Sequence, residues 1–143
     1  MEYQNYSSAP NTDLFQQEVV QYAGFWERFF AALIDGIILI IPSYILQYIF
    51  GDIPGSLLSI VLNWIYYATM ESGVSQATIG KKAMGLSVTD VDGSRISFAQ
   101  ATGRFFGRYL STLILLIGYF MMLWDEKKQT LHDKMANTLV IKN

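Results

Sequence analysis

The chain has 143 residues, and ten lysines and arginines against twelve aspartates and glutamates give a formal net charge of −2. Hydrophobic residues make up 52% of it and charged residues 15%, whereas ordinary soluble domains carry roughly 25% charged residues. This composition is typical of a one-domain integral membrane protein, and the near-neutral charge argues against nucleic acid as a partner. The absence of cysteine excludes a disulfide framework, a thiolate metal site and a cysteine nucleophile.

Residues 1–22 are predicted to form a flexible polar tail. They contain no lysine or arginine and no apolar block, so they lack the features of a signal peptide. The remaining residues, 23–143, are predicted to form one membrane domain, whose own hydrophobic segments would drive insertion. We expect a cytoplasmic N-terminus in a bacterial inner membrane.

The first predicted membrane helix covers residues 23–50. At about 1.5 Å per residue this run exceeds the roughly 30 Å thickness of the hydrocarbon layer, so a tilt or a hydrated first turn is expected. The run contains Arg28, Asp35 and Pro42. A membrane proline most often produces a kink, although it also frees a carbonyl that could bind an ion.

A glycine- and proline-containing loop then leads into a second predicted helix over residues 56–72. This segment has Asn63 in its middle and Glu71 at its end, and its length falls within the usual spanning range. The two helices are predicted to form a hairpin.

Residues 73–98 are predicted to form a cytoplasmic loop that contains a β-hairpin. Short β-prone runs flank Asp92-Gly93, a pair suited to a two-residue turn. The interfacial tail, residues 125–143, ends in another β-prone run from Asn137. This run could pair with the hairpin only if both lie on the same side of the membrane.

The third hydrophobic segment covers residues 97–124, beginning at Ser97 as a suitable N-cap. If it crosses the membrane once, the tail lysines lie opposite the middle loop. If it returns, all ten basic residues share one side, as the positive-inside rule favours. The segment is too short for two full spans, so we favour a re-entrant or half-helix hairpin bent near residues 116–118, with three plain spans as the alternative.

Three motifs in order carry a family resemblance: "GFWERFFAALIDGII", "SQATIGKKAMGLSVTDVDG" and "DEKKQTLHDKMANTLVI". Together they resemble the RDD family of small membrane proteins, named for one arginine and two aspartates. By this resemblance the family residues are Arg28, Asp35 and Asp133, while Asn137 replaces a usual glycine and still permits a turn. Some members of the family look like cation/proton antiporters, and related domains in larger proteins act as membrane scaffolds.

The triad itself predicts a contact between distant segments. Arg28 and Asp35 share one helix face, but the arginine would normally extend away from the aspartate. A pair between Arg28 and Asp133 requires the tail to return to the side where the first helix begins. We expect this pair to clasp the first helix to the tail, with substrate binding or simple interfacial anchoring as alternatives.

Asp35 is the candidate proton or ion site. A carboxylate at membrane depth costs roughly 2.5–3.5 kcal/mol on insertion scales, and it usually faces a bundle interior or a hydrated cavity. In one interpretation Asp35 exchanges a proton for a cation, assisted by Asn63 and Ser43. In the other it only makes a structural hydrogen bond, to a carbonyl or to Asn63.

The remaining charged residues are predicted to lie at the interface. Glu71 is expected to pair with Lys81, Lys82 or Arg104, and anionic lipid headgroups are the expected partners of the basic residues Lys81, Lys82, Arg104 and Arg108. The "ATIGKKAMGL" run lacks the upstream glycine of a phosphate-binding loop. His132, the single histidine, has no recognisable ligand spacing around it, so we expect neither a metal site, nor a cofactor, nor an enzyme.

Two functions therefore remain open for this predicted α-helical membrane protein with its small cytoplasmic β-structure. The first is a monovalent cation/proton antiporter with Asp35 as the coupling acid, which would require a homo-oligomer to enclose a pathway. The second is a non-transporting scaffold or assembly factor for a membrane protein partner. In that case Arg28, Asp35 and Asp133 are structural.

Overall fold

The computed structural model describes residues 20–113 and 120–143. Most of the predicted N-terminal tail and the predicted bend near residues 116–118 lie outside these ranges. The described chain is mostly helical, with one small antiparallel sheet.

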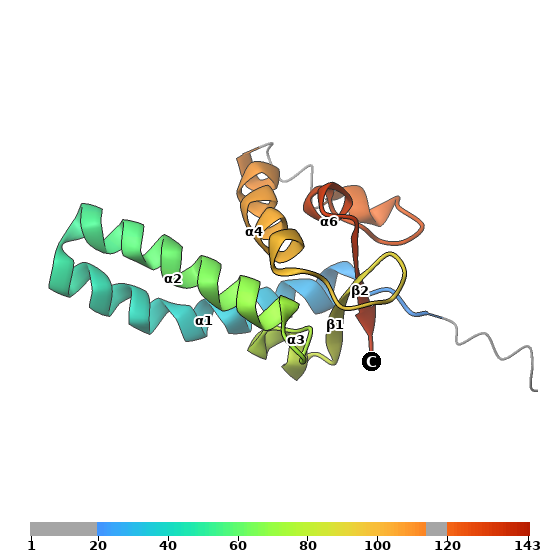
Figure 1. The fold of residues 1–143 in the computed structure, drawn as a ribbon, viewed down its shortest axis with the longest axis horizontal. Coiled ribbons are helices and arrows are strands. Elements are labelled where there is room, and N and C mark those ends of the chain that lie inside the picture. Colours follow the sequence, from blue (N-terminus) through green and yellow to red (C-terminus); the bar gives the residue numbers. More distant parts are fainter. Residues whose placement is uncertain (1–19, 114–119) are drawn as a thin grey trace, which may run out of the picture.

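Two long antiparallel helices, α1 (Phe25–Phe50) and α2 (Asp52–Ser72), form the hairpin that the sequence predicts (Figure 1). Gly51 makes the turn with a φ of 83°, a conformation that glycine adopts readily. Gly55 then lets the helices approach closely, because a Cβ there would lie 2.4 Å from the Cα of Gln47. α2 begins at Asp52, earlier than predicted, and it accommodates Pro54 in its first turn, where a missing N–H is tolerated.

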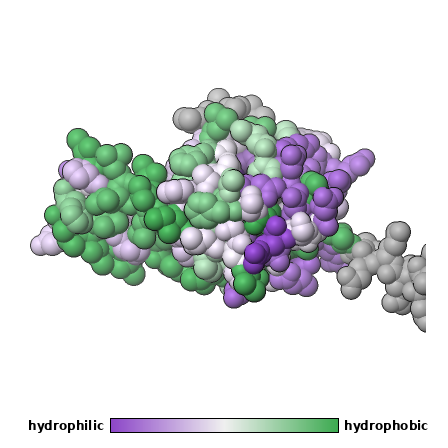
Figure 2. All heavy atoms as spheres, in the orientation of Figure 1, coloured by the Kyte–Doolittle hydropathy of each residue, from purple (hydrophilic) through white to green (hydrophobic). Residues whose placement is uncertain are grey.

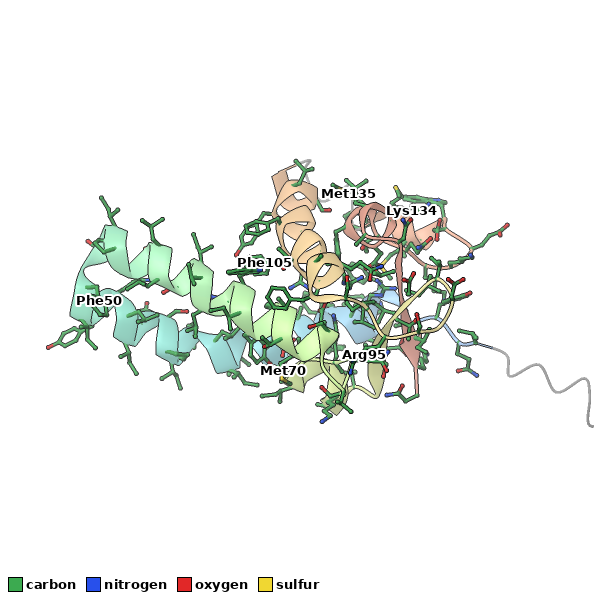
Figure 3. All side chains as sticks on the ribbon, viewed as in Figure 1. Phe50, Met70, Arg95, Phe105, Lys134 and Met135 are labelled. Atoms are coloured by element: carbon green, nitrogen blue, oxygen red, sulfur yellow. The ribbon has the colours of Figure 1, made fainter. Side chains whose placement is uncertain are left out.

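The surface separates into an apolar and a polar half. The hairpin is covered by hydrophobic residues, whereas the opposite end of the molecule is largely hydrophilic (Figure 2). Figure 3 places Phe50 at the tip of the hairpin, and Arg95 and Lys134 at the polar end. Within the described ranges, α1 is the one helix both long and apolar enough to cross a membrane. The predicted set of three membrane segments is therefore not confirmed.

The third segment contributes an amphipathic helix, α4 (Phe98–Leu113). Ser97 caps it as predicted, because its Oγ accepts a hydrogen bond from the Gln100 amide at 3.1 Å while the Gln100 side chain accepts one from the Ser97 amide at 2.9 Å. A short 3-10 helix, η2 (Met121–Leu123), follows further along. α4 extends to residue 113, where the first described range ends.

The sheet pairs strands that are far apart in the sequence. β1 (Leu86–Asp90) runs antiparallel to β2 (Thr138–Lys142), with Leu86 opposite Lys142 and Asp90 opposite Thr138. The predicted local hairpin around Asp92-Gly93 is limited to a tight turn, in which the Asp90 amide donates to the Ser94 carbonyl at 2.8 Å and an isolated bridge joins Thr89 to Arg95. Thr89 pairs with Leu139 of β2 as well as with Arg95, so β2 adds to the local turn, and the middle loop and the tail lie together.

Two short helices complete the polar end, and the sequence did not predict either. α3 (Ile79–Ala83) follows α2, and α6 (Leu131–Met135) precedes β2. Thr78 caps α3 by accepting a hydrogen bond from the Lys81 amide, and Thr130 and Asp133 form a capping box on α6. The core between the hairpin, α4 and the sheet consists of small and aliphatic residues, including Ala31, Ala68, Leu86, Val88, Ile96 and Val140.

Candidate functional site

Asp35 lies in the interior of the protein, with 1% of its surface exposed. Its carboxylate accepts three hydrogen bonds: from the Tyr66 hydroxyl at 2.7 Å, the Thr78 hydroxyl at 2.6 Å and the Gly80 amide at 2.8 Å. These three donors are matched by the acceptor oxygens of the carboxyl group. Asp35 therefore joins α1 to α2 and to α3.

This arrangement depends on a glycine at position 80. A Cβ there would lie 2.0 Å from the Ala31 carbonyl oxygen and 2.9 Å from the Asp35 carboxyl group. Only glycine therefore lets α3 come close enough to α1 for its amide to reach Asp35. The Tyr66 hydroxyl also accepts a hydrogen bond from the Ile79 amide at 3.1 Å, which holds the same segment in place.

The residues predicted to assist Asp35 lie elsewhere on the hairpin. Asn63 donates to the carbonyl of Ser59 at 2.7 Å, one turn back in its own helix. The Ser59 hydroxyl in turn lies 3.3 Å from the Ser43 carbonyl, so these residues join α1 to α2. Within the described chain, the hydrogen bonds of Asp35 come from Tyr66, Thr78 and Gly80 rather than from Asn63 or Ser43.

A second cluster forms around the buried guanidinium of Arg104 on α4. Its Nε donates to Glu71 at 3.0 Å, and its Nη1 pairs with Asp133 and with the Thr138 hydroxyl. Lys81 forms a second ion pair with Glu71. The sequence predicts that Glu71 pairs at the interface with Lys81, Lys82 or Arg104 and that these cations meet lipid headgroups. Glu71, Lys81 and Arg104 instead point into the protein, where their pairing with one another offsets the cost of burial.

The structure brings Arg28 and Asp133 together, as the triad predicts. The Arg28 Nη1 lies 2.5 Å from Asp133, while its Nη2 donates to the Lys128 carbonyl at 2.8 Å. The Thr130 amide donates to the same carboxylate oxygen at 3.0 Å. Asp133 is thus held by Arg28 on one side and by Arg104 on the other, and it fastens α6 to both α1 and α4.

Burial and neighbouring charges set the protonation of the polar end. Burial alone would raise the pKa of Asp133, but Arg104 and Arg28 hold that pKa well below its usual range. Burial lowers the pKa of His132 to about 3, so this histidine is neutral at physiological pH. Burial also lowers the pKa of Lys81 to about 8, although Glu71 opposes the change.

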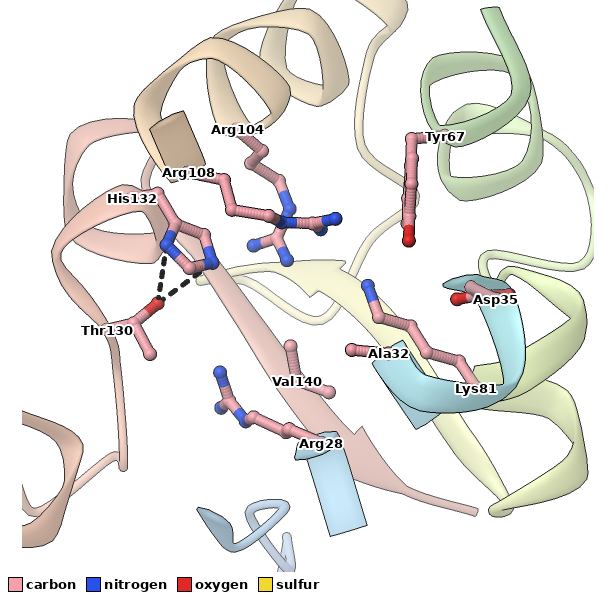
Figure 4. A pocket seen from close by; sticks show the side chains of 10 residues that line it. All are labelled: Arg28, Ala32, Asp35, Tyr67, Lys81, Arg104, Arg108, Thr130, His132 and Val140. Atoms are coloured by element: carbon pink, nitrogen blue, oxygen red, sulfur yellow. Dashed lines mark hydrogen bonds between the residues drawn. The ribbon is translucent and has the colours of Figure 1, made fainter. Parts of the chain in front are cut away.

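A cavity of about 60 Å³ lies between the two clusters (Figure 4). The residues that line it are Arg28, Ala32, Asp35, Tyr67, Lys81, Arg104, Arg108, Thr130, His132 and Val140. Four of them are cations and one, Asp35, is an acid. No group of three metal-ligating side chains occurs in the ranges that the structure covers.

Arg108 and Lys82 were both predicted to bind lipid headgroups, but their surroundings in the structure differ. The Arg108 guanidinium lies over the Tyr67 ring, 4.3 Å from its centroid, and 3.8 Å from Glu71. Lys82, in contrast, is exposed on α3. Sequence reasoning missed Tyr66 and Tyr67, which lie outside the three family motifs, and Thr138, which lies within the third motif but was given no role there. Thr78 carried a signal, since a threonine just before a short helix is a common N-cap.

Similar proteins are found in bacteria. The chain is 36% identical to uncharacterized protein YxaI of Bacillus subtilis (strain 168), over 83% of this chain and 96% of the relative. It is 29% identical to uncharacterized membrane protein YteJ of the same strain, over 84% of this chain and 80% of the relative. A proline-rich antigen homolog of Mycobacterium tuberculosis (strain ATCC 25618 / H37Rv) is 30% identical, over 61% of this chain and 35% of the relative.

No solved structure matches the fold. The model of the RDD family matches residues 22–137, a range that includes the ion-paired Arg28 and Asp133 and the buried Asp35. The family and the apolar helix α1 together indicate a membrane protein. The chain belongs to the RDD family.

Proposed function

We propose that this protein is a non-transporting membrane scaffold whose Arg28, Asp35 and Asp133 hold its fold together. The main support for the proposal is the burial and hydrogen bonding of Asp35. Its carboxylate is buried and accepts hydrogen bonds from three fixed donors on α2 and around the start of α3. A cation that bound Asp35 would have to displace these donors.

The basic side chains around the cavity also argue against cation binding at Asp35. Asp35 shares the cavity with Arg28, Lys81, Arg104 and Arg108. Like charges repel strongly where water is partly excluded. A sodium or potassium ion that entered the cavity would therefore meet a positive potential, which opposes the exchange of a proton for a cation at Asp35.

The rest of the molecule suits an anchored scaffold. Large apolar side chains on the hairpin are exposed, among them Ile41, Tyr44, Tyr48 and Ile53. They would contact the lipid bilayer or the helices of a membrane protein partner. The polar end, held by ion pairs, would present its loops on one side of the membrane. A homo-oligomer is not required, because no ion pathway has to be enclosed.

Ion flux into proteoliposomes tests this proposal against the antiporter. Wild-type protein and Asp35→Asn would be reconstituted with a pH-sensitive dye inside, and sodium, lithium or potassium would be added outside. We expect both proteins to match empty liposomes with every ion. Proton movement driven by any of these cations in the wild type, and lost in a folded Asp35→Asn variant, would establish the antiporter instead.

A further inference from the structure

The cavity between α1, α2 and α4 is lined mainly by basic side chains, a feature that the scaffold proposal does not explain. Its lining carries Arg28, Lys81, Arg104 and Arg108, with Asp35 as the one acid among the lining residues described. Glu71 and Asp133 lie behind the cations and pair with them. The whole cluster holds four cations against three acids, so one positive charge is in excess.

Neutral hydrogen-bonding groups complete this lining. The Tyr67 hydroxyl points toward the cavity, and Thr130 and His132 lie on the opposite wall (Figure 4). The Thr130 hydroxyl lies 3.1 Å from the His132 Nε2. Positive side chains together with hydroxyl groups are typical of sites that bind phosphate oxygens.

Exposure of the basic side chains shows where the cavity opens. The Arg108 side chain is 23% exposed and that of Arg28 13%, whereas those of Lys81 and Arg104 are 9% and 2% exposed. Ala32, which lines the cavity from α1, is also exposed, and Phe29, one turn earlier on the same helix, is 47% exposed. The opening therefore lies between α1 and α4, at the base of the apolar hairpin.

We propose that this cavity binds a phosphate-type oxyanion, with Arg108 and Arg28 at its entrance and Lys81, Arg104 and Tyr67 deeper inside. A cavity of about 60 Å³ has room for a group of the size of a phosphate. The phosphate of a lipid headgroup and a free phosphate share this chemistry. The inference does not depend on the scaffold proposal, because an anion site is compatible with either function.

The test uses the full chain in lipid nanodiscs and two probes. Inorganic phosphate, with chloride at matched ionic strength as the reference, would be titrated while thermal unfolding is followed in phosphatidylcholine discs. In a second arm, phosphatidylglycerol would replace part of the phosphatidylcholine, and bound lipid would be counted by native mass spectrometry. A response to phosphate alone assigns a free anion, and a response to phosphatidylglycerol alone assigns a headgroup.

Variants decide whether the response comes from the cavity. Arg108→Gln should weaken binding about tenfold, because one charge-assisted hydrogen bond is lost. Lys82→Gln removes an exposed charge on α3, outside the cavity, and should leave binding unchanged. Tyr67→Phe keeps the ring beneath Arg108 and removes only the hydroxyl group, so it provides a second test should Arg108→Gln fail to fold.

Two outcomes would overturn the inference. In the first, neither phosphate nor phosphatidylglycerol stabilises or binds the wild-type protein beyond the chloride and phosphatidylcholine references. In the second, Lys82→Gln weakens binding as much as Arg108→Gln and Tyr67→Phe do, which would indicate general attraction to the basic surface.

Discussion

Arg104 contacts two buried carboxylates at once, Glu71 on α2 and Asp133 on α6. Its own side chain is 2% exposed, so water cannot replace it in either pair. A buried ion pair adds little net stability compared with apolar packing, but breaking it leaves a charge without compensation. The stability of the polar end therefore depends on this residue more than on Arg28, whose side chain is partly exposed.

Replacing Arg104 should therefore destabilise the protein strongly. We expect Arg104→Gln to lower the free energy of unfolding by about 3–5 kcal/mol, the usual range for removing one partner of a buried pair. Denaturant or thermal unfolding in detergent measures this change. Lys82→Gln, which removes an exposed cation nearby, is the matched control and should change stability little. Equal stability of the two variants would show that the Arg104 pairs are unimportant.

His132 should make the protein sensitive to acid. Its pKa is about 3 in the folded state and 6.5 in the unfolded chain. Between these values the unfolded state binds more protons, so stability falls as the pH decreases, by at most about 1.4 kcal/mol per pH unit. We expect the melting temperature of the wild type to drop from pH 6.5 downward, with Asp133 adding to the loss below its ordinary pKa of 3.8.

His132→Asn isolates the contribution of the histidine. Above pH 4 this variant should lose less stability with acidification than the wild type does, because no imidazole is present to take up a proton on unfolding. Parallel slopes in the two proteins between pH 6.5 and 4 would contradict the assignment of a neutral, buried His132.

At the scale of elements, the close contact between α1 and α3 depends on Gly80. Its Cβ position is occupied by the Ala31 carbonyl oxygen, whereas the Cβ position of Gly36, one residue beyond Asp35, has no atom within 4 Å. A side chain is therefore excluded sterically at position 80 but not at position 36. Gly80 allows an approach of two backbones, and Gly36 faces open space on α1.

This difference gives a matched pair of variants. Gly80→Ala should push α3 away from α1, lengthen the hydrogen bonds to Asp35 and destabilise the protein by several kcal/mol, on the order of other severe steric changes. Gly36→Ala should be neutral or stabilising by up to about 1 kcal/mol, because alanine favours a helix. Thermal unfolding in the same detergent compares the two, and a harmless Gly80→Ala would contradict the described contact.

The elements show which parts of the fold could be predicted from sequence. The hairpin was predicted because long apolar runs bounded by glycine are a local signal, and the cap at Ser97 is equally local. The pairing of β1 with β2 was predicted only conditionally, since residues 86–90 and 138–142 are brought together by tertiary contacts. Asp35, Arg28 and Asp133 were identified from the family motifs, whereas Tyr66 lies outside these motifs and contributes a single polar group whose partner depends on the packing of distant segments.

At the scale of the whole molecule, the charges gather at one end and the apolar helices extend from it (Figure 2). The ion pair between Arg28 and Asp133 requires the start of α1 and the tail to lie on the same side. Since α1 is long enough to span the membrane, the turn at Gly51 would lie on the other side. An arrangement with all basic residues on one side also satisfies the positive-inside rule.

Cysteine labelling tests this sidedness, and the chain has no cysteine of its own to interfere. In intact cells, a membrane-impermeant maleimide should label Asp52→Cys, which is exposed at the turn. It should label Lys127→Cys and Lys82→Cys only after the cells are opened, because both belong to the polar end. Labelling of all three positions under the same condition would contradict the arrangement.

The central claim is that the donors around Asp35 form a fixed structure rather than a site that opens to bind cations. Hydrogen–deuterium exchange in nanodiscs measures this directly at the segment that contains the Gly80 amide. We predict slow exchange there that is the same in sodium, lithium, potassium and choline, and faster exchange in Asp35→Asn. Exchange in the wild type that accelerates when sodium, lithium or potassium replaces choline would contradict the claim.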